Sequence, residues 1–324
     1  MVNSMIEPIF LQGVCKDYIW GGNRLRQEFG KISDADIIAE SWELACHKDG
    51  SSIIISNKDK GLNITEYIAK YGTGFLGTNC KDIKTLPILI KLIDAKENLS
   101  IQVHPDDEYS MKVEGEPGKT EMWYIIDAEM GATIYYGVKR CVSKDEFLKR
   151  IENQTLTEVL NRVEVTPGQL IFIPSGTLHA IGAGILLAEI QQNSNITYRV
   201  YDYGRIGRDG KLRELNINKA MEIANLTPMK PTVQYESRII GDATVRKLEH
   251  CKYFSSDLMY VSTKVFLCVD SKSLQHLLIL EGKGILTVAG IDYSFHKGNS
   301  ILLPANLGKY SVTGKCRLIL TYMD

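Results

Sequence analysis

The chain has 324 residues, with 38 lysines and arginines against 39 aspartates and glutamates, so its formal net charge is −1 at pH 7. This length allows one large domain or two modest ones, and the balanced charge argues against a nucleic-acid-binding or membrane-binding surface. No apolar run is long enough to span a bilayer, residues 1–7 lack a signal-peptide pattern, and seven scattered cysteines without a CxxC pattern indicate reduced thiols in a cytoplasmic protein.

The first hundred residues predict strands and one helix. Residues 16–23 are typical of a strand end followed by a glycine turn, and Trp20 there is either a packed core residue or an aromatic wall that stacks on a sugar. Residues 39–45 alternate like a strand, with Trp42 in the core or the wall of a barrel. Residues 65–72 have the start, spacing and final glycine of a helix. Residues 86–95 predict a strongly apolar strand.

The stretch from Leu99 to Asp107 carries the first candidate ligands. Ile101 and Val103 alternate with Gln102 and His104 and are followed by a proline, which has no N–H to continue a strand ladder. Because side chains on a strand repeat every second residue, Gln102 and His104 are expected to point to the same face. This pair could form half of a metal site.

Two later stretches supply the other half. Glu121 lies in a β-rich run that follows a glycine-rich loop, and His179 lies just beyond a Pro-x-Gly turn that ends an apolar strand. Two histidines, one carboxylate and one amide oxygen suit a divalent ion such as zinc, with a position left for water or substrate.

Between these two stretches the period changes to that of a helix. Ser143 and Glu146 form a capping-box pattern, and the apolar residues that follow predict one helix and then a second short one. We expect a helical insert at about residues 143–162 that acts as a lid or flank of the site.

From about residue 243 the chain predicts a second β module. Gly298, five residues and Pro304 repeat the spacing of Gly168 and Pro174, but Lys309 stands where the first copy has His179. We therefore expect a C-terminal domain at 243–324 without a metal, beside a catalytic domain at 1–242.

These motifs together resemble a known family. Gly168, Pro174, Gly176 and His179 are similar to the second cupin motif, and the Gln-x-His…Glu set is similar to the first. The chain resembles type I mannose-6-phosphate isomerases, which are zinc-dependent aldose–ketose isomerases. The resemblance implies a mainly β fold of two cupin-type jelly-roll barrels with a small helical insert. It also implies one Zn²⁺ per chain at Gln102, His104, Glu121 and His179.

The resemblance extends to a Glu-x-Gln…Asn-x-x-x-Arg segment that begins at Glu189. It implies that Arg199 is the catalytic cation, that Trp20 contacts the sugar and that Arg205 contacts its phosphate. Glu189 and Lys119 are the candidates for acid–base catalysis, because moving a proton between C1 and C2 through an enediol requires such a group.

Two other functions stay open: a non-catalytic sugar-binding cupin and a metal-dependent cupin dioxygenase. The expected partner is a small-molecule sugar phosphate rather than nucleic acid or membrane, and the expected state is a monomer or a homodimer.

Overall fold

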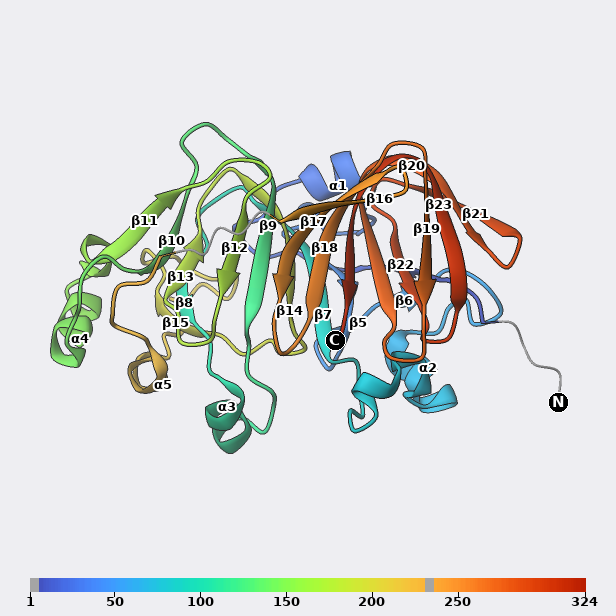
Figure 1. The fold of residues 1–324 in the computed structure, drawn as a ribbon. Coiled ribbons are helices and arrows are strands. Elements are labelled where there is room, and N and C mark those ends of the chain that lie inside the picture. The colour runs from blue at the N-terminus through green and yellow to red at the C-terminus, as the bar shows by residue number, and fades with distance from the viewer. Residues whose placement is uncertain (1–5, 231–235) are drawn as a thin grey trace.

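The computed structural model describes residues 6–230 and 236–324, and it confirms a mainly β fold with few helices (Figure 1). Within these residues, no helix is long and apolar enough to cross a bilayer. The helices are α1 (Arg24–Phe29), α2 (Ile64–Tyr71), α3 (Asp107–Val113), α4 (Lys144–Glu152) and α5 (Ile217–Ile223), with 3₁₀ turns at Gly74–Leu76, Thr78–Cys80 and Leu156–Glu158.

Three sheets organise the chain. The six-stranded central sheet has the order β12-β9-β14-β7-β3-β2, the five-stranded facing sheet has the order β11-β10-β13-β8-β15, and the C-terminal sheet has ten strands. The central sheet comprises β2 (Val14–Lys16), β3 (Glu40–Leu44), β7 (Ile88–Ala95), β9 (Glu121–Ala128), β12 (Leu170–Ile173) and β14 (Ile185–Gln192). The facing sheet comprises β8 (Ile101–Val103), β10 (Thr133–Val138), β11 (Leu160–Glu164), β13 (His179–Ile181) and β15 (Tyr198–Tyr201).

The C-terminal sheet also takes strands from the beginning of the chain. It comprises β1 (Ile9–Gln12), β6 (Ile53–Ile54), β16 (Ser237–Ile240), β17 (Ala243–His250), β18 (Ser255–Val261), β19 (Lys264–Val269), β20 (Gln275–Val288), β21 (Ile291–His296), β22 (Ser300–Leu303) and β23 (Gly308–Tyr322). A short hairpin, β4 (Cys46–His47) and β5 (Gly50–Ser51), stands apart. Because β1 pairs with β22, the predicted units 1–242 and 243–324 share one sheet.

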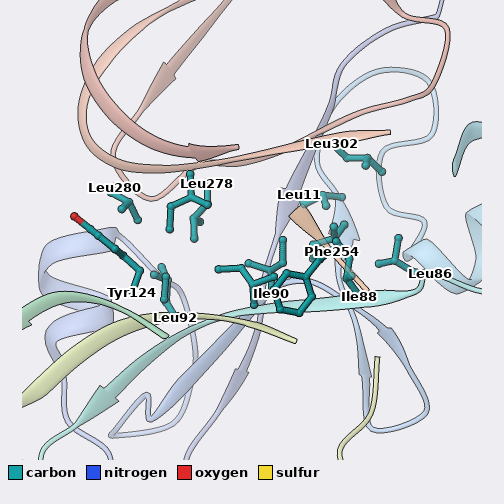
Figure 2. Packing of buried hydrophobic residues seen from close by; sticks show 14 of the residues in the cluster. Leu11, Leu86, Ile88, Ile90, Leu92, Tyr124, Phe254, Leu278, Leu280 and Leu302 are labelled. Carbon is teal, nitrogen blue, oxygen red and sulfur yellow. The ribbon is translucent and has the colours of Figure 1, made fainter. Parts of the chain in front are cut away.

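The middle strands of the central sheet are buried on both faces. Every residue of β7 and β14 is buried, and successive side chains of a strand point to opposite faces. Ile88, Ile90 and Leu92 of β7 therefore pack on one side, in one hydrophobic cluster with residues of the C-terminal sheet. Figure 2 shows this packing, with Leu278 and Leu302 above β7.

The other face of the central sheet is turned towards the facing sheet. Ile93 of β7 and Trp123 of β9 pack there against Ile134 and Ile181 of the facing sheet. Polar residues that share this register, such as Glu121 on β9, are thereby directed into the space between the two sheets.

The helical insert covers the outer side of the facing sheet (Figure 1). Phe147 and Ile151 of α4 pack in one cluster with Ile101 and Val103 of β8. The insert is therefore a flank of the site rather than a lid over it. Its second predicted helix is only the 3₁₀ turn Leu156–Glu158.

Strand β11 starts at Leu160 because the chain there pairs antiparallel with β10, so the helical part ends earlier than predicted. Half of the predicted capping box is present, since Ser143 Oγ accepts the N–H of Glu146. The Glu146 carboxylate accepts hydrogen bonds from Arg140 and Arg150.

The internal repeat is visible in the backbone. Gly168 and Gly298, the first residues of the two copies, have φ values of 89° and 88°. This left-handed conformation favours glycine, and at Gly298 a Cβ would also lie 2.2 Å from the Phe29 carbonyl oxygen.

Candidate metal centre and active-site cavity

His104, Glu121 and His179 come together at the ends of three strands. Glu121 begins β9, His179 begins β13, and His104 follows β8 directly. One ligand atom from each residue lies within 4.8 Å of the other two, and all three side chains are buried. Among the described residues, these are the only three His, Cys, Asp or Glu side chains that form such a group.

Backbone hydrogen bonds join the two motifs that were recognised in the sequence. The N–H of Gly176 donates to the carbonyl of His104 at 2.8 Å, so the Pro-x-Gly turn rests on the Gln-x-His stretch. Gly176 has a φ of 82°, a conformation that glycine adopts without strain. The turn therefore fixes where His179 emerges relative to His104.

The histidines are held as neutral tautomers with Nε2 available. Nδ1 of His104 lies 2.8 Å from the carbonyl of Ile196, and Nδ1 of His179 lies 2.8 Å from the carbonyl of Thr177. A carbonyl only accepts, so each Nδ1 carries the proton and each Nε2 carries a lone pair. Burial lowers the pKa of His179 to about 4 and holds the pKa of His104 well below its ordinary value.

Glu121 faces both of these lone pairs. Its Oε1 lies 3.3 Å from Nε2 of His179, and its Oε2 lies 3.6 Å from Nε2 of His104. Both carboxylate oxygens are buried; Oε1 has no hydrogen-bond donor, and Oε2 is paired with the Lys119 ammonium at 2.9 Å. Burial, followed by the charge of Glu189, raises the pKa of Glu121 to about 7.

This donor set fits a divalent cation. Two imidazole lone pairs and a buried carboxylate, one of whose oxygens has no hydrogen-bond donor, converge on one point, and a cation there would be bound by all three groups. Lys119, whose Nζ lies 3.2 Å from Nε2 of His104, supplies a positive charge to the same place.

Gln102 lies at the edge of this group. It is the register partner of His179 across β8 and β13, and its Nε2 lies 3.3 Å from Nε2 of His179. In this orientation the amide donates to the imidazole lone pair. A half-turn of the amide would present Oε1 instead, so Gln102 keeps its candidacy as a ligand.

A second buried group, here called the paired row, crosses the central sheet. Trp42, Lys91, Glu189 and Trp123 are successive register partners on β3, β7, β14 and β9. Lys91 Nζ lies 2.9 Å from Glu189 Oε1, and Trp123 Nε1 donates to Glu189 Oε2 at 3.0 Å.

The charges in this row stabilise one another. Burial opposes ionisation of Glu189, but Lys91 and Lys119 outweigh it and hold the pKa of Glu189 at about 2. Burial likewise opposes the charge on Lys91, but Glu189 and Glu40 raise its pKa above the ordinary value. Glu189 is therefore a carboxylate and Lys91 an ammonium at neutral pH.

A cavity of about 280 Å³ lies beside these two groups and is lined mainly by polar side chains. It reaches the metal-capable group through Gln102 and Lys119, and the paired row through Lys91 and Glu189. The remaining lining residues are Tyr18, Trp20, Glu40, Ile93, Leu99, Ser100, Ile181, Asn195, Thr197, Arg199 and Arg213.

Arg199 lies on the facing sheet as the register partner of Gln102. Its Nε donates to Ser100 Oγ at 3.0 Å and one terminal nitrogen donates to the carbonyl of Glu214 at 3.1 Å. Burial, followed by the charge of the nearby Arg213, lowers the pKa of Arg199 from the ordinary value. Four cationic side chains therefore line the cavity, those of Lys91, Lys119, Arg199 and Arg213.

Trp20 and Arg205 have different surroundings. Trp20 is in the cavity wall, but Tyr18 stacks on it with ring centroids 5.6 Å apart, so Tyr18 offers a second aromatic surface. Arg205 is outside the residues that line the cavity and is bound to Asp202 and the carbonyl of Asn98.

Comparisons with known proteins agree with this geometry. Residues 9–154 match the family described as phosphomannose isomerase type I, catalytic domain, and residues 244–323 match mannose-6-phosphate isomerase, cupin domain. Mannose-6-phosphate isomerase ManA of Bacillus subtilis is 38% identical over 320 residues, covering 98% of this chain and 99% of that protein. The chain belongs to the type I phosphomannose isomerase family.

Other relatives extend the comparison. Mannose-6-phosphate isomerase of Streptococcus mutans is 35% identical, with 99% of each chain covered. The crystal structure of mannose 6-phosphate isomerase from B. subtilis matches with a TM-score of 0.91 at 35% identity, covering 97% of this chain and 99% of that one. A mutant phosphomannose isomerase from Salmonella typhimurium, at 18% identity, shares the fold with a TM-score of 0.77 over 98% of this chain and 99% of that one.

Several cavity residues were not singled out from the sequence. Lys91 was hidden in a run predicted as a strongly apolar strand, although a charged residue within such a run is itself a signal of a buried pair. Glu40 alternates with Trp42 on β3, and the sequence around it contains no comparable signal. Arg213 lies in an irregular stretch without a motif.

The paired row predicts a specific stability effect. Lys91→Met should lower the free energy of unfolding by about 3–5 kcal/mol, because it leaves Glu189 charged and buried beside fewer cations. The double variant Lys91→Met/Glu189→Gln should recover most of this loss. Urea unfolding of the single and double variants measures the coupling.

Lys48→Met is the control, since it removes an exposed lysine paired with Glu116 and should unfold like the wild type. Equal stability of Lys91→Met and Lys48→Met would contradict the pairing.

Proposed function

We propose that the chain is a mannose-6-phosphate isomerase that interconverts mannose 6-phosphate and fructose 6-phosphate in the cytoplasm. The observation that carries the proposal is the buried His104–Glu121–His179 group beside a polar cavity, in a chain related over its whole length to enzymes of that name. The substrate is a small sugar phosphate, and a monomer or homodimer remains the expected state.

His104, Glu121 and His179 would hold the metal, with Gln102 as a fourth candidate. Two imidazole nitrogens and a carboxylate favour zinc. When bound, zinc would supply Lewis-acid polarisation of the sugar oxygens. The lone pairs fixed by Ile196 and Thr177 support this assignment, because the histidines need no rearrangement to bind.

Of the two acid–base candidates, the surroundings favour Lys119. Glu189 is held as a carboxylate by Lys91 and has a pKa of about 2, which makes it a weak base near neutral pH. Lys119 reaches the cavity and is adjacent to the metal-capable group. A divalent cation bound at the adjacent group would favour the neutral amine of Lys119. In the proposed reaction, this amine takes the proton from C1 or C2, the resulting ammonium returns it to the other carbon, and Glu189 keeps Lys91 oriented.

Positive charge in the cavity suits the enediolate that this proton transfer creates. Lys91 and Arg199 both line the cavity, and fixed cations at developing negative charge lower the barrier. Arg213 is the additional lining cation for the phosphate, and Arg205 could reach it only by leaving Asp202. The stacked rings of Tyr18 and Trp20 would provide an aromatic wall for the sugar.

The metal assignment predicts about one zinc per chain by elemental analysis. Chelation should abolish isomerisation, and His179→Ala should lose the metal because one of three converging ligands is gone. His296→Ala is the matched control, since His296 lies on β21 of the C-terminal sheet. A fully active preparation without metal would refute the assignment.

The enediol route predicts exchange with solvent. Turnover in heavy water should place deuterium on the carbon that receives the transferred proton, because Lys119 Nζ equilibrates with water between turnovers. Nuclear magnetic resonance of the product measures the label. A direct hydride shift would leave that carbon unlabelled through many turnovers.

Substitution of Arg199 distinguishes a catalytic role from a substrate-binding role. Arg199→Ala should lower kcat by about two to three orders of magnitude, as loss of a fixed donor to developing charge does, while zinc content and KM change little. Arg140→Ala is the control, because Arg140 pairs with Glu146 of the helical insert outside the cavity lining, and we expect a near-normal kcat. A folded Arg199→Ala variant with wild-type kcat would contradict the role.

A further inference from the structure

The segment that carries Glu121 is held by hydrogen bonds from two sides. The N–H of Lys119 donates to the carbonyl of Pro105 at 2.9 Å, and the N–H of Thr120 donates to Gln192 Oε1 at 2.9 Å. The N–H of Gln192 in turn donates to the carbonyl of Thr120 at 3.1 Å. These bonds set the position from which β9 starts.

Asp107, the first residue of α3, joins these supports. Its Oδ1 accepts from the N–H of Gly118 at 3.0 Å and from Nε2 of Gln192 at 2.8 Å. Its Oδ2 accepts from the hydroxyl of Tyr253 at 2.9 Å, with the Lys252 ammonium 3.8 Å away. One carboxylate thus binds the segment before Lys119, the residue that supports Thr120, and the C-terminal part of the chain.

The approach of the loop to α3 is close. A Cβ at Gly118 would lie 2.4 Å from the carbonyl carbon of Asp106 and 2.6 Å from the nitrogen of Asp107. Only glycine fits there without displacing the backbone. The loop is therefore pressed against the start of α3, where the Asp107 carboxylate can reach it.

Asp107 is charged at neutral pH despite partial burial. Burial raises its pKa, but the hydrogen bonds from Gln192, Gly118 and Tyr253 outweigh this and lower the pKa below its ordinary value. An ionised acceptor makes stronger hydrogen bonds than a neutral one. The charged carboxylate therefore holds its three hydrogen-bond donors together.

Tyr253 brings the C-terminal sheet into this junction. It lies in the turn between β17 and β18, next to Phe254, which is buried in the cluster between the central and C-terminal sheets. The turn is anchored by Phe254, and Tyr253 extends from it to Asp107. The C-terminal part of the chain therefore has a direct route to the segment that bears Glu121.

We propose that Asp107 is a positioning residue through which Tyr253 holds the Gly118–Glu121 segment in the geometry that binds the metal. This inference rests on the proposed metal site. It gives the C-terminal sheet a part in the site although it contributes no ligand: the turn at Tyr253 restrains Asp107, Asp107 restrains Gly118 and Gln192, and these place Glu121.

The test measures Zn²⁺ dissociation constants by competition with a chelator, on full-length variants. Asp107→Asn should weaken Zn²⁺ binding about tenfold, as loss of a group that orients a ligand does, and Tyr253→Phe should weaken it about two- to fivefold, as loss of one hydrogen bond does. The double variant should bind like Asp107→Asn, because Tyr253 acts through Asp107.

Tyr310→Phe is the matched control, because its hydroxyl bonds to Gln275 within the C-terminal sheet. It should bind Zn²⁺ like the wild type, and the Tm of metal-free Tyr253→Phe should match that of metal-free Tyr310→Phe. If Asp107→Asn does not fold, the two tyrosine variants decide the question alone.

Equal Zn²⁺ affinity of Tyr253→Phe and Tyr310→Phe would overturn the inference. This result differs from a failure of the proposed function, in which the wild-type protein itself would bind no Zn²⁺.

Discussion

Burial of the middle strands of the central sheet on both faces is the constraint on which the rest of the structure depends. The middle strands of a sheet between two other sheets offer a charged side chain little solvent, so such a residue is stabilised by a partner of opposite charge. Lys91 and Glu189 meet this requirement by standing opposite each other on β7 and β14. The same burial leaves Glu121 Oε1 without a hydrogen-bond donor, which is tolerable in a site that binds a cation.

The sequence predicted the metal-capable group well because its signals are local. The alternation of Gln102 and His104 and the turn before His179 depend on a few neighbouring residues, and the expected convergence with Glu121 is present. The Lys91–Glu189 pair depends on which strands are neighbours and in what register, and no local pattern contains that information. Arg205 was named from the resemblance alone, and its side chain is bound to Asp202 outside the residues that line the cavity.

The mainly β class and the repeated glycine-to-proline spacing could likewise be predicted, since both are properties of short segments. The sharing of strands between the two predicted units could not be predicted in this way. A division near residue 242 follows from where the second repeat begins along the chain, whereas β1 joins the C-terminal sheet by pairing Ile9 with Leu302. Long-range pairing of this kind is decided by the burial of whole faces, and Ile9 and Leu302 belong to the same cluster between the sheets.

The pairing of β1 with β22 also sets an order of events during synthesis. Residues 9–11 leave the ribosome about 290 residues before their partners at 300–302, which at typical elongation rates is a delay of roughly 15–60 s. Until then one edge of β1 has no partner, and Ile9 and Leu11 lack part of the cluster that buries them. Completion of this hydrophobic core is therefore a late step, and the nascent chain is a candidate for chaperone protection throughout that interval.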